Sequence, residues 1–173
     1  LYNCPCIALW TVFNEAWGQF DSQRMTQKLL ALDDTRLVDS TSGWYDQGAP
    51  VRSIHRYILP FRMPKRDSRH VVLSEYGGYS MKVAGHVFNE KKTFGYLVYS
   101  DKDKMNAAIE KLLRKQILPA VEQGLCAAIY TQLSDVENEQ NGLVTYDRKV
   151  VKADEEVFAV ANALMCSAVT DED

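Results

Sequence analysis

The chain has 173 residues, which is enough for one ordinary domain with a sizeable core. Its 46% hydrophobic and 25% charged residues are typical of a globular protein and argue against a disordered or membrane-embedded chain. The net charge of -3 gives no reason to expect nucleic acid or an anionic membrane as a partner. No apolar run approaches the roughly 20 residues that a membrane-spanning helix needs.

In chain order, the apolar pattern predicts alternating strands and helices. Short runs rich in β-branched and aromatic residues predict strands, whereas apolar residues spaced three and four apart predict helices. The expected order is strand 7–13, helix 21–32, strands 36–40, 52–57 and 70–74, helix 101–123, strand 125–131 and helix 154–165. The segment from 75 to 100 is expected to be a long polar loop.

These strands are apolar throughout rather than alternating, and most are separated by helices or long loops. That pattern is typical of a parallel sheet that is buried on both faces, so the expected fold class is α/β. No repeat, low-complexity tract or linker divides the chain. The sequence therefore predicts one domain over residues 1–173.

The cysteines give no indication of a metal site. Cys4 and Cys6 stand in a Cys-Pro-Cys segment, which is not zinc-ligand spacing, and no second His or Cys pair completes a site. We therefore expect plain thiols, with no metal and no cofactor. The first residues lack both an initiator Met and a signal peptide, which suggests a piece of a longer protein and gives no information about the compartment.

Two glutamates stand at the ends of two predicted strands. Glu15 follows an apolar run and Asn14, and Glu75 follows the run HVVLS. Because functional groups of parallel α/β folds gather at the carboxyl ends of strands, both acids are expected at one site. Two facing carboxylates among aromatic rings favour glycoside hydrolysis, in which one acid protonates the leaving oxygen and the other attacks the anomeric carbon or activates water. A lone strand-end acid is more often a solvated loop residue.

The motifs around these acids resemble a known family. IALWTVFNEAW is similar to the fourth-strand motif of glycoside hydrolase family 2, the β-galactosidase, β-glucuronidase and β-mannosidase group, and VVLSEYGG is similar to its seventh-strand motif. The stretch from 35 to 57 resembles the fifth- and sixth-strand region, and the stretch from 124 to 149 resembles the eighth strand with its following loop. The resemblance implies a partial (β/α)8 TIM barrel whose parallel strands correspond to four through eight.

The resemblance also implies roles for the matching residues. Glu15 matches the general acid/base, and Asn14 matches the residue that hydrogen-bonds the sugar 2-hydroxyl. Glu75 matches the catalytic nucleophile, and Tyr57 matches a tyrosine that hydrogen-bonds this nucleophile. The family is retaining on β-glycosides, so the two carboxyl groups are expected ~5–5.5 Å apart.

Three further residues are expected to bind the sugar. His55 stands where many relatives carry Asn, so it either lines the sugar pocket or is a satisfied strand histidine. Trp17, close to the acid/base, offers a ring on which a sugar face can stack. Tyr130 stands roughly where relatives place a Trp at the end of the eighth strand, which is a departure from the family at the floor of the pocket.

The loop after the last predicted strand favours a neutral sugar. β-Glucuronidases carry Asn-x-Lys there to bind the substrate carboxylate, and the matching stretch in this chain is Asn141-Gly142-Leu143, without the lysine. Lys149 or Lys152 would have to substitute for it, which we do not expect. The substrate expected is therefore a neutral β-glycoside, with a β-galactoside first.

A complete barrel of this kind takes ~250 residues, so the chain would lack its first three strands, and also the family's preceding β-sandwich domains. Open sheet edges would then favour a homo-oligomer or a longer chain that covers them. Three functions stay open: a retaining β-glycosidase, a catalytically inert fragment, and a non-catalytic carbohydrate-binding protein. The pair of acids argues against the third, and the missing strands favour the second when this chain is assayed alone.

Overall fold

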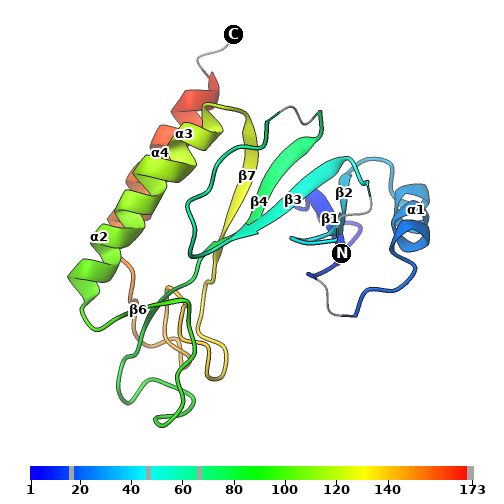
Figure 1. The fold of residues 1–173 in the computed structure, drawn as a ribbon. Helices are drawn as coiled ribbons and strands as arrows, with labels where there is room; N and C mark the ends of the chain where they lie inside the picture. Colours follow the sequence, from blue (N-terminus) through cyan, green and yellow to red (C-terminus); the bar gives the residue numbers. More distant parts are fainter. Residues whose placement is uncertain (16–17, 46–47, 66–67, 171–173) are drawn as a thin grey trace. The chain divides into compact units, whose positions relative to one another are not determined.

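The computed structural model describes residues 1–15, 18–45, 48–65 and 68–170 (Figure 1). Among these residues, no helix has the length and apolar character needed to cross a membrane. The internal contacts divide the chain into two compact units. Unit 1 consists of Leu1–His55, Met63–Glu75 and Leu125–Ala128, and unit 2 of Arg56–Arg62, Tyr76–Gly124 and Ile129–Asp173. The single domain expected from the sequence stays a prediction.

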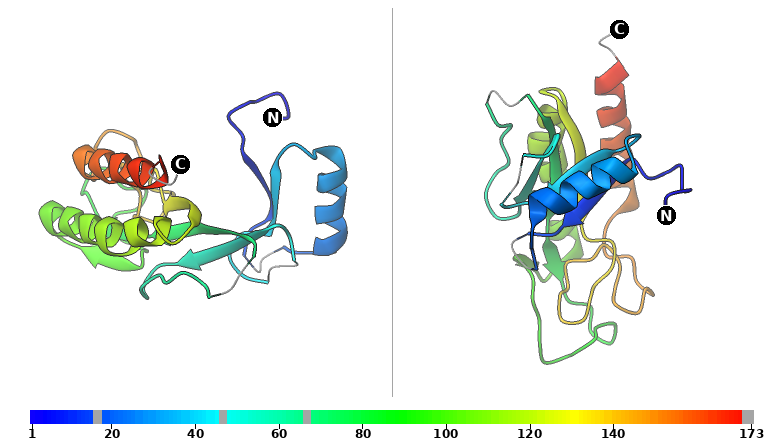
Figure 2. Two further views of the ribbon diagram at one scale, coloured as in Figure 1. Left: turned by 90° about the horizontal axis from the view of Figure 1, so that it is seen from above. Right: turned by 90° about the vertical axis from the view of Figure 1, so that its right-hand side faces the viewer.

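Unit 1 begins with a strand, a helix and a second strand. Strands β1 (Leu9–Phe13) and β2 (Leu37–Thr41) pair in parallel, with Leu9 opposite Leu37. Helix α1 (Ser22–Leu32) connects them and packs against both, as Figure 2 shows from two further directions. A parallel pair needs a crossover of this kind, because the chain must return to the starting end of the first strand.

A buried carboxylate ties these three elements together. Asp33, directly after α1, accepts hydrogen bonds from Trp10 Nε1 on β1 (2.7 Å) and from Arg36 Nη1 just before β2 (2.6 Å). The hydroxyl of Thr35, together with Trp10 and Arg36, holds the pKa of Asp33 well below its ordinary value. The mid-strand tryptophan is therefore part of the framework of unit 1.

The second sheet is parallel and has the strand order β3–β4–β7, formed by Val51–Arg56, His70–Gly77 and Leu125–Thr131. Buried and half-buried residues alternate along β3, as expected for side chains that point to opposite faces of a strand. Val51, Ser53 and His55 are the buried members of this alternation. The sequence of β3 thus places a histidine on the buried side of the strand.

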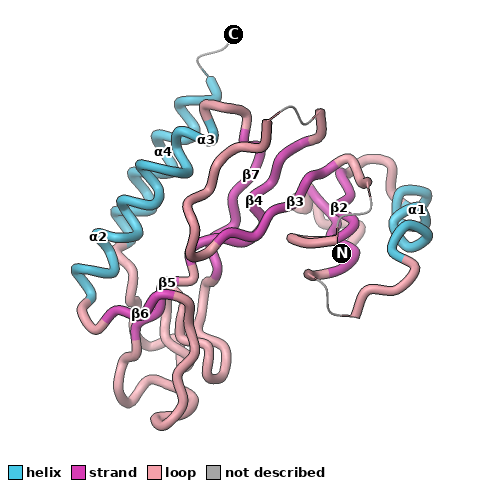
Figure 3. The backbone as a smooth tube through the Cα atoms, in the orientation of Figure 1, coloured by secondary structure: helices cyan, strands magenta, loops and turns pink. Residues whose placement is uncertain are grey.

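Unit 2 contains another parallel pair and the long helices. The short strands β5 (Tyr79–Met81) and β6 (Leu97–Tyr99) pair within the segment expected to be a loop. Helix α4 (Glu155–Thr170) lies alongside the long helix expected over 101–123 (Figure 3). That long helix has three parts: α2 (Lys102–Leu112), a π-helical turn (Leu113–Ile117) and α3 (Leu118–Val121).

Local chemistry explains the course of the long helix. Asp101 caps its start, because its side chain accepts a hydrogen bond from the Lys104 backbone N–H (2.9 Å). Met105 and Ile109, four residues apart, are buried on one face. The π-helical turn comes directly before the last turn, which contains Pro119. Proline has no backbone N–H for the regular helical bond, which accounts for the change in helix type.

The partial TIM barrel expected from the sequence is wrong. Strands form close to each of the five expected positions, but they belong to separate sheets of two and three strands, and β5 with β6 forms another. Within the described part of the chain, no ladder joins β2 to β3, where a barrel would continue. Apolar runs identify strands but not their partners, because pairing depends on contacts between residues far apart in the sequence. The chain is a small mixed α/β protein.

Candidate active site

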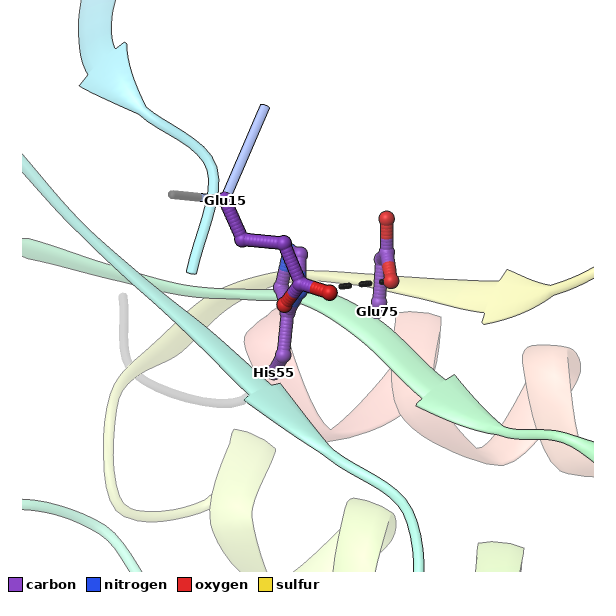
Figure 4. Close-up of side chains that lie close together, drawn as sticks. All are labelled: Glu15, His55 and Glu75. Carbon is purple, nitrogen blue, oxygen red and sulfur yellow. Dashed lines mark hydrogen bonds and ion pairs between the residues drawn. The ribbon is translucent and has the colours of Figure 1, made fainter. Parts of the chain in front are cut away.

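Two carboxylates and an imidazole converge in unit 1 (Figure 4). Glu15 stands two residues after β1, His55 near the end of β3, and Glu75 within β4. His55 Nδ1 lies 2.5 Å from Glu15 Oε2 and 3.3 Å from Glu75 Oε2. The three facing atoms lie within 4.8 Å of one another. The two acids singled out by the sequence are therefore neighbours, and both contact the same histidine.

The three side chains differ in their exposure to solvent. The side chain of His55 is 1% exposed, whereas those of Glu15 and Glu75 are 24% and 26% exposed. The alternation along β3 buries the ring, whereas both carboxylates remain partly exposed. A ligand can thus reach the carboxylates, but it cannot surround the imidazole.

Ser42 and Gly43, directly after β2, also contact the imidazole ring. Ser42 Oγ lies 2.8 Å from His55 Nε2. Gly43 has a φ of +93°, and a Cβ at this residue would lie 2.7 Å from His55 Nδ1. Only glycine combines that backbone conformation with so close an approach to the ring. The ring is therefore fixed in position and in orientation.

Three serine hydroxyls form a chain of hydrogen bonds that begins at the contact between Ser42 and the ring. Ser42 Oγ donates a hydrogen bond to Ser74 Oγ (2.9 Å), and Ser53 Oγ donates to the same atom (2.6 Å). Ser74 in turn donates to the carbonyl oxygen of Ile54 (3.4 Å). This serine chain (Ser42, Ser53 and Ser74) connects the end of β2 with β3 and β4. Because Ser74 directly precedes Glu75, the chain also fixes the backbone that carries one of the acids.

The atom types of this cluster are those of a metal site, but the spacing is not. One imidazole nitrogen and two carboxylate oxygens are common ligands of zinc and related ions. Two ligands of a tetrahedral zinc ion, each ~2.0–2.1 Å from it, lie ~3.3 Å apart. The 2.5 Å between His55 Nδ1 and Glu15 Oε2 is much shorter than that and is the length of a strong hydrogen bond. The arrangement fits a shared proton better than a metal ion.

Two of the residues expected to bind the sugar flank Glu15. Asn14 directly precedes the acid and is exposed, so its side chain is accessible to a ligand. Trp17 lies outside the described residues. The role expected for each stays a prediction.

Two other expected sugar-binding residues belong to unit 2. The ring of Tyr57 stacks on that of Tyr96, with the centroids 3.9 Å apart and the planes within 7° of parallel. Tyr130 is half-buried and packs edge-on against Tyr76 (5.4 Å) and Phe158 (5.3 Å). Burial raises the pKa of the Tyr130 phenol and raises that of Tyr76 to about 12. Both of the expected residues therefore have packing partners in unit 2. The hydrogen bond expected from Tyr57 to the nucleophile and the contact expected between Tyr130 and a sugar stay predictions.

The sequence pattern missed the residues that support the histidine. The missed residues are Ser42, Gly43, Ser53 and Ser74. Ser53 could have been predicted to lie near His55, because it stands two residues before it and residues two apart on a strand share a face. Ser74 had a weaker signal, since it directly precedes an acid. Nothing in the glycine-rich turn after β2 indicated that it would approach the ring.

Comparison with known proteins adds no family assignment. No family model matches the chain, and a search of curated proteins finds no match. The function is therefore inferred from the geometry of the cluster and from the motifs that carry its two acids.

Proposed function

We propose that the chain carries the catalytic carboxylates of a retaining β-glycosidase, as the resemblance of its motifs to glycoside hydrolase family 2 implies. The observation that carries this proposal is the convergence of Glu15 and Glu75, whose facing oxygens lie within 4.8 Å of each other. Retaining glycosidases need their two carboxyl groups ~5–5.5 Å apart, whereas inverting enzymes leave ~6.5–9.5 Å for a water molecule. The spacing therefore supports double displacement over direct attack by water.

In this proposal the two acids have different roles in a two-step reaction. Glu75 attacks the anomeric carbon, and Glu15 gives its proton to the departing glycosidic oxygen, so that a glycosyl ester forms on Glu75 as the aglycone leaves. Glu15, now ionised, then takes a proton from water, which attacks the anomeric carbon and breaks the ester. The sugar leaves with its original configuration, and both acids return to their starting states.

The sugar-binding roles in the proposal follow the motifs. Asn14 would hydrogen-bond the 2-hydroxyl, and Trp17 would stack against a sugar face. Tyr57 would donate its phenolic proton to the nucleophile, and Tyr130 would contribute to the floor of the pocket. His55 would line the site from beneath the two acids, which agrees with its contacts to both.

We propose a neutral sugar as the substrate, with a β-galactoside first. Lys152 is fully buried, and its ammonium donates to Asp135 Oδ1 (2.6 Å) and to the carbonyl oxygens of Gln140 (3.0 Å) and Met81 (3.1 Å). An ammonium has three N–H donors, so none remains for a substrate carboxylate. Asn141 is also buried, and its side chain is occupied by Gln132 and Glu139. These contacts make Lys152 unsuitable as a substitute for the missing lysine.

The proposal is tested by trapping the glycosyl ester. The complete protein is incubated with 2-deoxy-2-fluoro-β-galactosyl fluoride, in which the fluorine at carbon 2 slows hydrolysis of the ester, and is then digested and analysed by mass spectrometry. We expect one added fluorosugar on the peptide that contains Glu75, and none in Glu75→Gln. The matched control Glu137→Gln, an exposed glutamate of unit 2, should be labelled like the wild type.

The stereochemistry of the product gives a second readout. Proton NMR of the first product formed from an aryl β-galactoside should show the β-anomer, because two inversions restore the configuration. An α-anomer, or a label on another residue, would overturn the assignment. Sugar binding without turnover or labelling would instead identify a carbohydrate-binding protein.

A further inference from the structure

Two exposed aromatic residues follow the glycine that packs against the imidazole ring. Trp44 and Tyr45 come directly after Gly43, and they are 55% and 68% exposed. Exposed apolar residues that are scattered singly over a surface need no explanation. Two adjacent aromatic residues next to a candidate active site are a different case, because their side chains offer a large flat apolar area to a ligand.

The segment that carries these two residues runs beside the segment that carries Glu15. Strand β2 pairs with β1 as far as Thr41, which lies opposite Phe13. The Ser42 N–H then donates to the carbonyl oxygen of Phe13 (2.9 Å). Because the two strands are parallel, the residues after β2 leave the sheet at the same end as the residues after β1.

The chain itself limits the distance between the aromatic residues and the acid. A Cβ on Gly43 would lie 2.7 Å from His55 Nδ1, and this nitrogen lies 2.5 Å from Glu15 Oε2. Since consecutive Cα atoms are ~3.8 Å apart, the Cα of Trp44 lies within ~11 Å of Glu15 Oε2. The two aromatic residues therefore stand close to a sugar that is held at the carboxylates.

Gln19 connects the aromatic segment with the residues that follow Glu15. Its side-chain amide donates to Thr41 Oγ1 at the end of β2 (2.8 Å) and also approaches the carbonyl oxygen of Tyr45 (3.5 Å). Gln19 stands four residues after Glu15. In the proposed mechanism the leaving group departs at Glu15, because this residue protonates the glycosidic oxygen. The aromatic segment thus flanks the side of the site where the leaving group is expected.

The backbone of Tyr45 adopts a conformation that bulky residues avoid. Its φ is +58°, in the left-handed region, where the Cβ comes too close to the following carbonyl oxygen. Burial of the side chain does not offset this cost, because Tyr45 is 68% exposed. Unfavourable backbone conformations of this kind are concentrated at active sites and ligand contacts.

We propose that Trp44 and Tyr45 form the leaving-group subsite of the glycosidase, where they bind the second sugar ring of a disaccharide or longer β-galactoside. The inference rests on the proposed function, which assigns the acid to Glu15. A sugar ring has an apolar C–H face and hydroxyls around its edge, so it stacks on an aromatic ring while its hydroxyls stay in water. Half-exposed aromatic residues suit such a ligand, whereas an aryl leaving group would gain more from an enclosed apolar pocket.

A comparison of leaving groups tests the proposal in the complete protein. Lactose releases glucose, which has a ring to stack, and methyl β-galactoside releases methanol, which has none. In Trp44→Ala we expect the ratio of kcat/KM for lactose to kcat/KM for methyl β-galactoside to fall ~3–10-fold, the range expected for the loss of one aromatic contact. The change should appear in KM rather than in kcat, because stacking binds the substrate and the transition state alike.

Two kinetic results would contradict the proposal. An unchanged ratio in Trp44→Ala would show that the indole makes no contact with the leaving group. A larger loss on phenyl β-galactoside than on lactose would identify an aryl subsite in place of a sugar subsite.

Tyr45→Gly separates ligand binding from folding. Glycine adopts a positive φ without strain, so the urea midpoint should not fall, whereas the lactose ratio should. A loss of stability with an unchanged ratio would leave Tyr45 a structural role only. Tyr2→Ala is the matched control, because Tyr2 is also exposed (60%) and lies over the guanidinium of Arg36, at the opposite ends of β1 and β2 from Glu15. This control should keep the ratio of the wild type.

Indole NMR tests the subsite without turnover, so it separates this inference from the proposed function. The chain has three tryptophans, and Trp44→Phe assigns one of the ¹⁵N-labelled indole signals. Lactose added to Glu75→Gln should shift the Trp44 signal, and methyl β-galactoside should shift it less. A shift with lactose in a protein whose wild type hydrolyses neither substrate would support the sugar-binding role of Trp44 and contradict the proposed function. Hydrolysis of both substrates with no shift at saturating lactose would overturn the subsite alone.

Discussion

The two units each contain a cluster of ionisable side chains, and the clusters differ in their exposure to solvent. In unit 2, Lys152 and Asp135 are 0% and 1% exposed, and the ammonium has three protein acceptors. In unit 1, Glu15 and Glu75 are each about a quarter exposed beside a buried histidine. The buried ammonium has no N–H left for a ligand, whereas the cluster of unit 1 presents two partly exposed carboxylates.

This difference separates a structural ion pair from a candidate active site. Burial lowers the pKa of Lys152, and the hydrogen bond with Asp135 opposes that shift. A buried charge of this kind is tolerated only because every donor is paired. Ionisable residues alone therefore do not mark a site, because a ligand also needs side chains that are accessible to solvent, as Glu15 and Glu75 are in part.

The largest expected effect is the loss of activity when Glu75 becomes Gln. Removal of a covalent nucleophile should lower kcat at least ~10⁴-fold on every β-galactoside, because no ester can form. The free energy of unfolding should change by less than about 0.5 kcal/mol, since the substitution keeps the shape of the side chain and removes a charge from beside Glu15. Steady-state kinetics and urea denaturation measure the two quantities. A loss of activity accompanied by unfolding would remove the contrast with Lys152.

The opposite result is expected for Lys152→Met. This substitution leaves the buried carboxylate of Asp135 without its cation, which should cost about 3–5 kcal/mol in the free energy of unfolding. Urea denaturation checks this value. The double variant with Asp135→Leu should recover much of the loss, because a buried charge is no longer left alone. A single variant as stable as the wild type would show that the pair does not hold unit 2 together.

A moderate effect is expected for Gly43→Ala. The positive φ alone should cost about 1–2 kcal/mol, and the new Cβ would also press on the His55 ring. Gly18→Ala is the matched control, because Gly18 also has a positive φ (+78°) but no atom within 4 Å of the added Cβ. We expect both variants to lose stability in urea denaturation, and only Gly43→Ala to lose kcat/KM on methyl β-galactoside as well. Equal kinetics in the two variants would mean that the ring position has no catalytic importance.

The smallest effect is expected at the surface of unit 2. The Thr145 hydroxyl and His86, whose Nδ1 lies 2.9 Å from Asp147 Oδ2, lower the pKa of Asp147 from 3.8 to about 2. A folded-state pKa below the unfolded value stabilises the fold above pH 3.8, and this stabilisation disappears as the pH falls through about 2. Asp147→Asn should therefore unfold at slightly lower urea concentration than the wild type at pH 6, with the midpoints converging near pH 2.

The control for this last prediction is Asp34→Asn, a substitution of an exposed aspartate in unit 1. It should show no comparable convergence as the pH falls. A constant difference between Asp147→Asn and the wild type from pH 6 to pH 2 would show that the loss does not come from the carboxylate's charge.

The sequence predicted local structure better than it predicted the arrangement of the strands. The helix expected over 21–32 forms at Ser22–Leu32, and the strand expected over 125–131 forms at Leu125–Thr131. Both are encoded by apolar spacing within the element itself. The prediction of a barrel was wrong because the pairing of strands depends on contacts between residues far apart in the sequence. The short strand Tyr79–Met81 was missed because three residues are too few for a periodic pattern.

At the candidate site, too, the local features were predictable from the sequence and the long-range contacts were not. The position of Glu15 and Glu75 after or within apolar strands was visible in the sequence, and so was their common chemistry. The place of His55 was not, because its two alternatives, a pocket residue and a satisfied strand histidine, depend on what surrounds it. In the structure its ring is buried against Gly43, and its Nδ1 faces the acids. Its role in a sugar pocket stays a prediction. Only tertiary contacts combine these two properties.

The close fit of Gly43 against the imidazole has a consequence for how this sequence can diverge. A side chain at position 43 is compatible only with a smaller residue at position 55, and a residue at 55 without a ring nitrogen would leave Ser42 without this hydrogen-bond partner. Changes at these positions are coupled, so each is harmful when made alone. Among descendants of this chain, positions 42, 43 and 55 are therefore expected to change together or not at all.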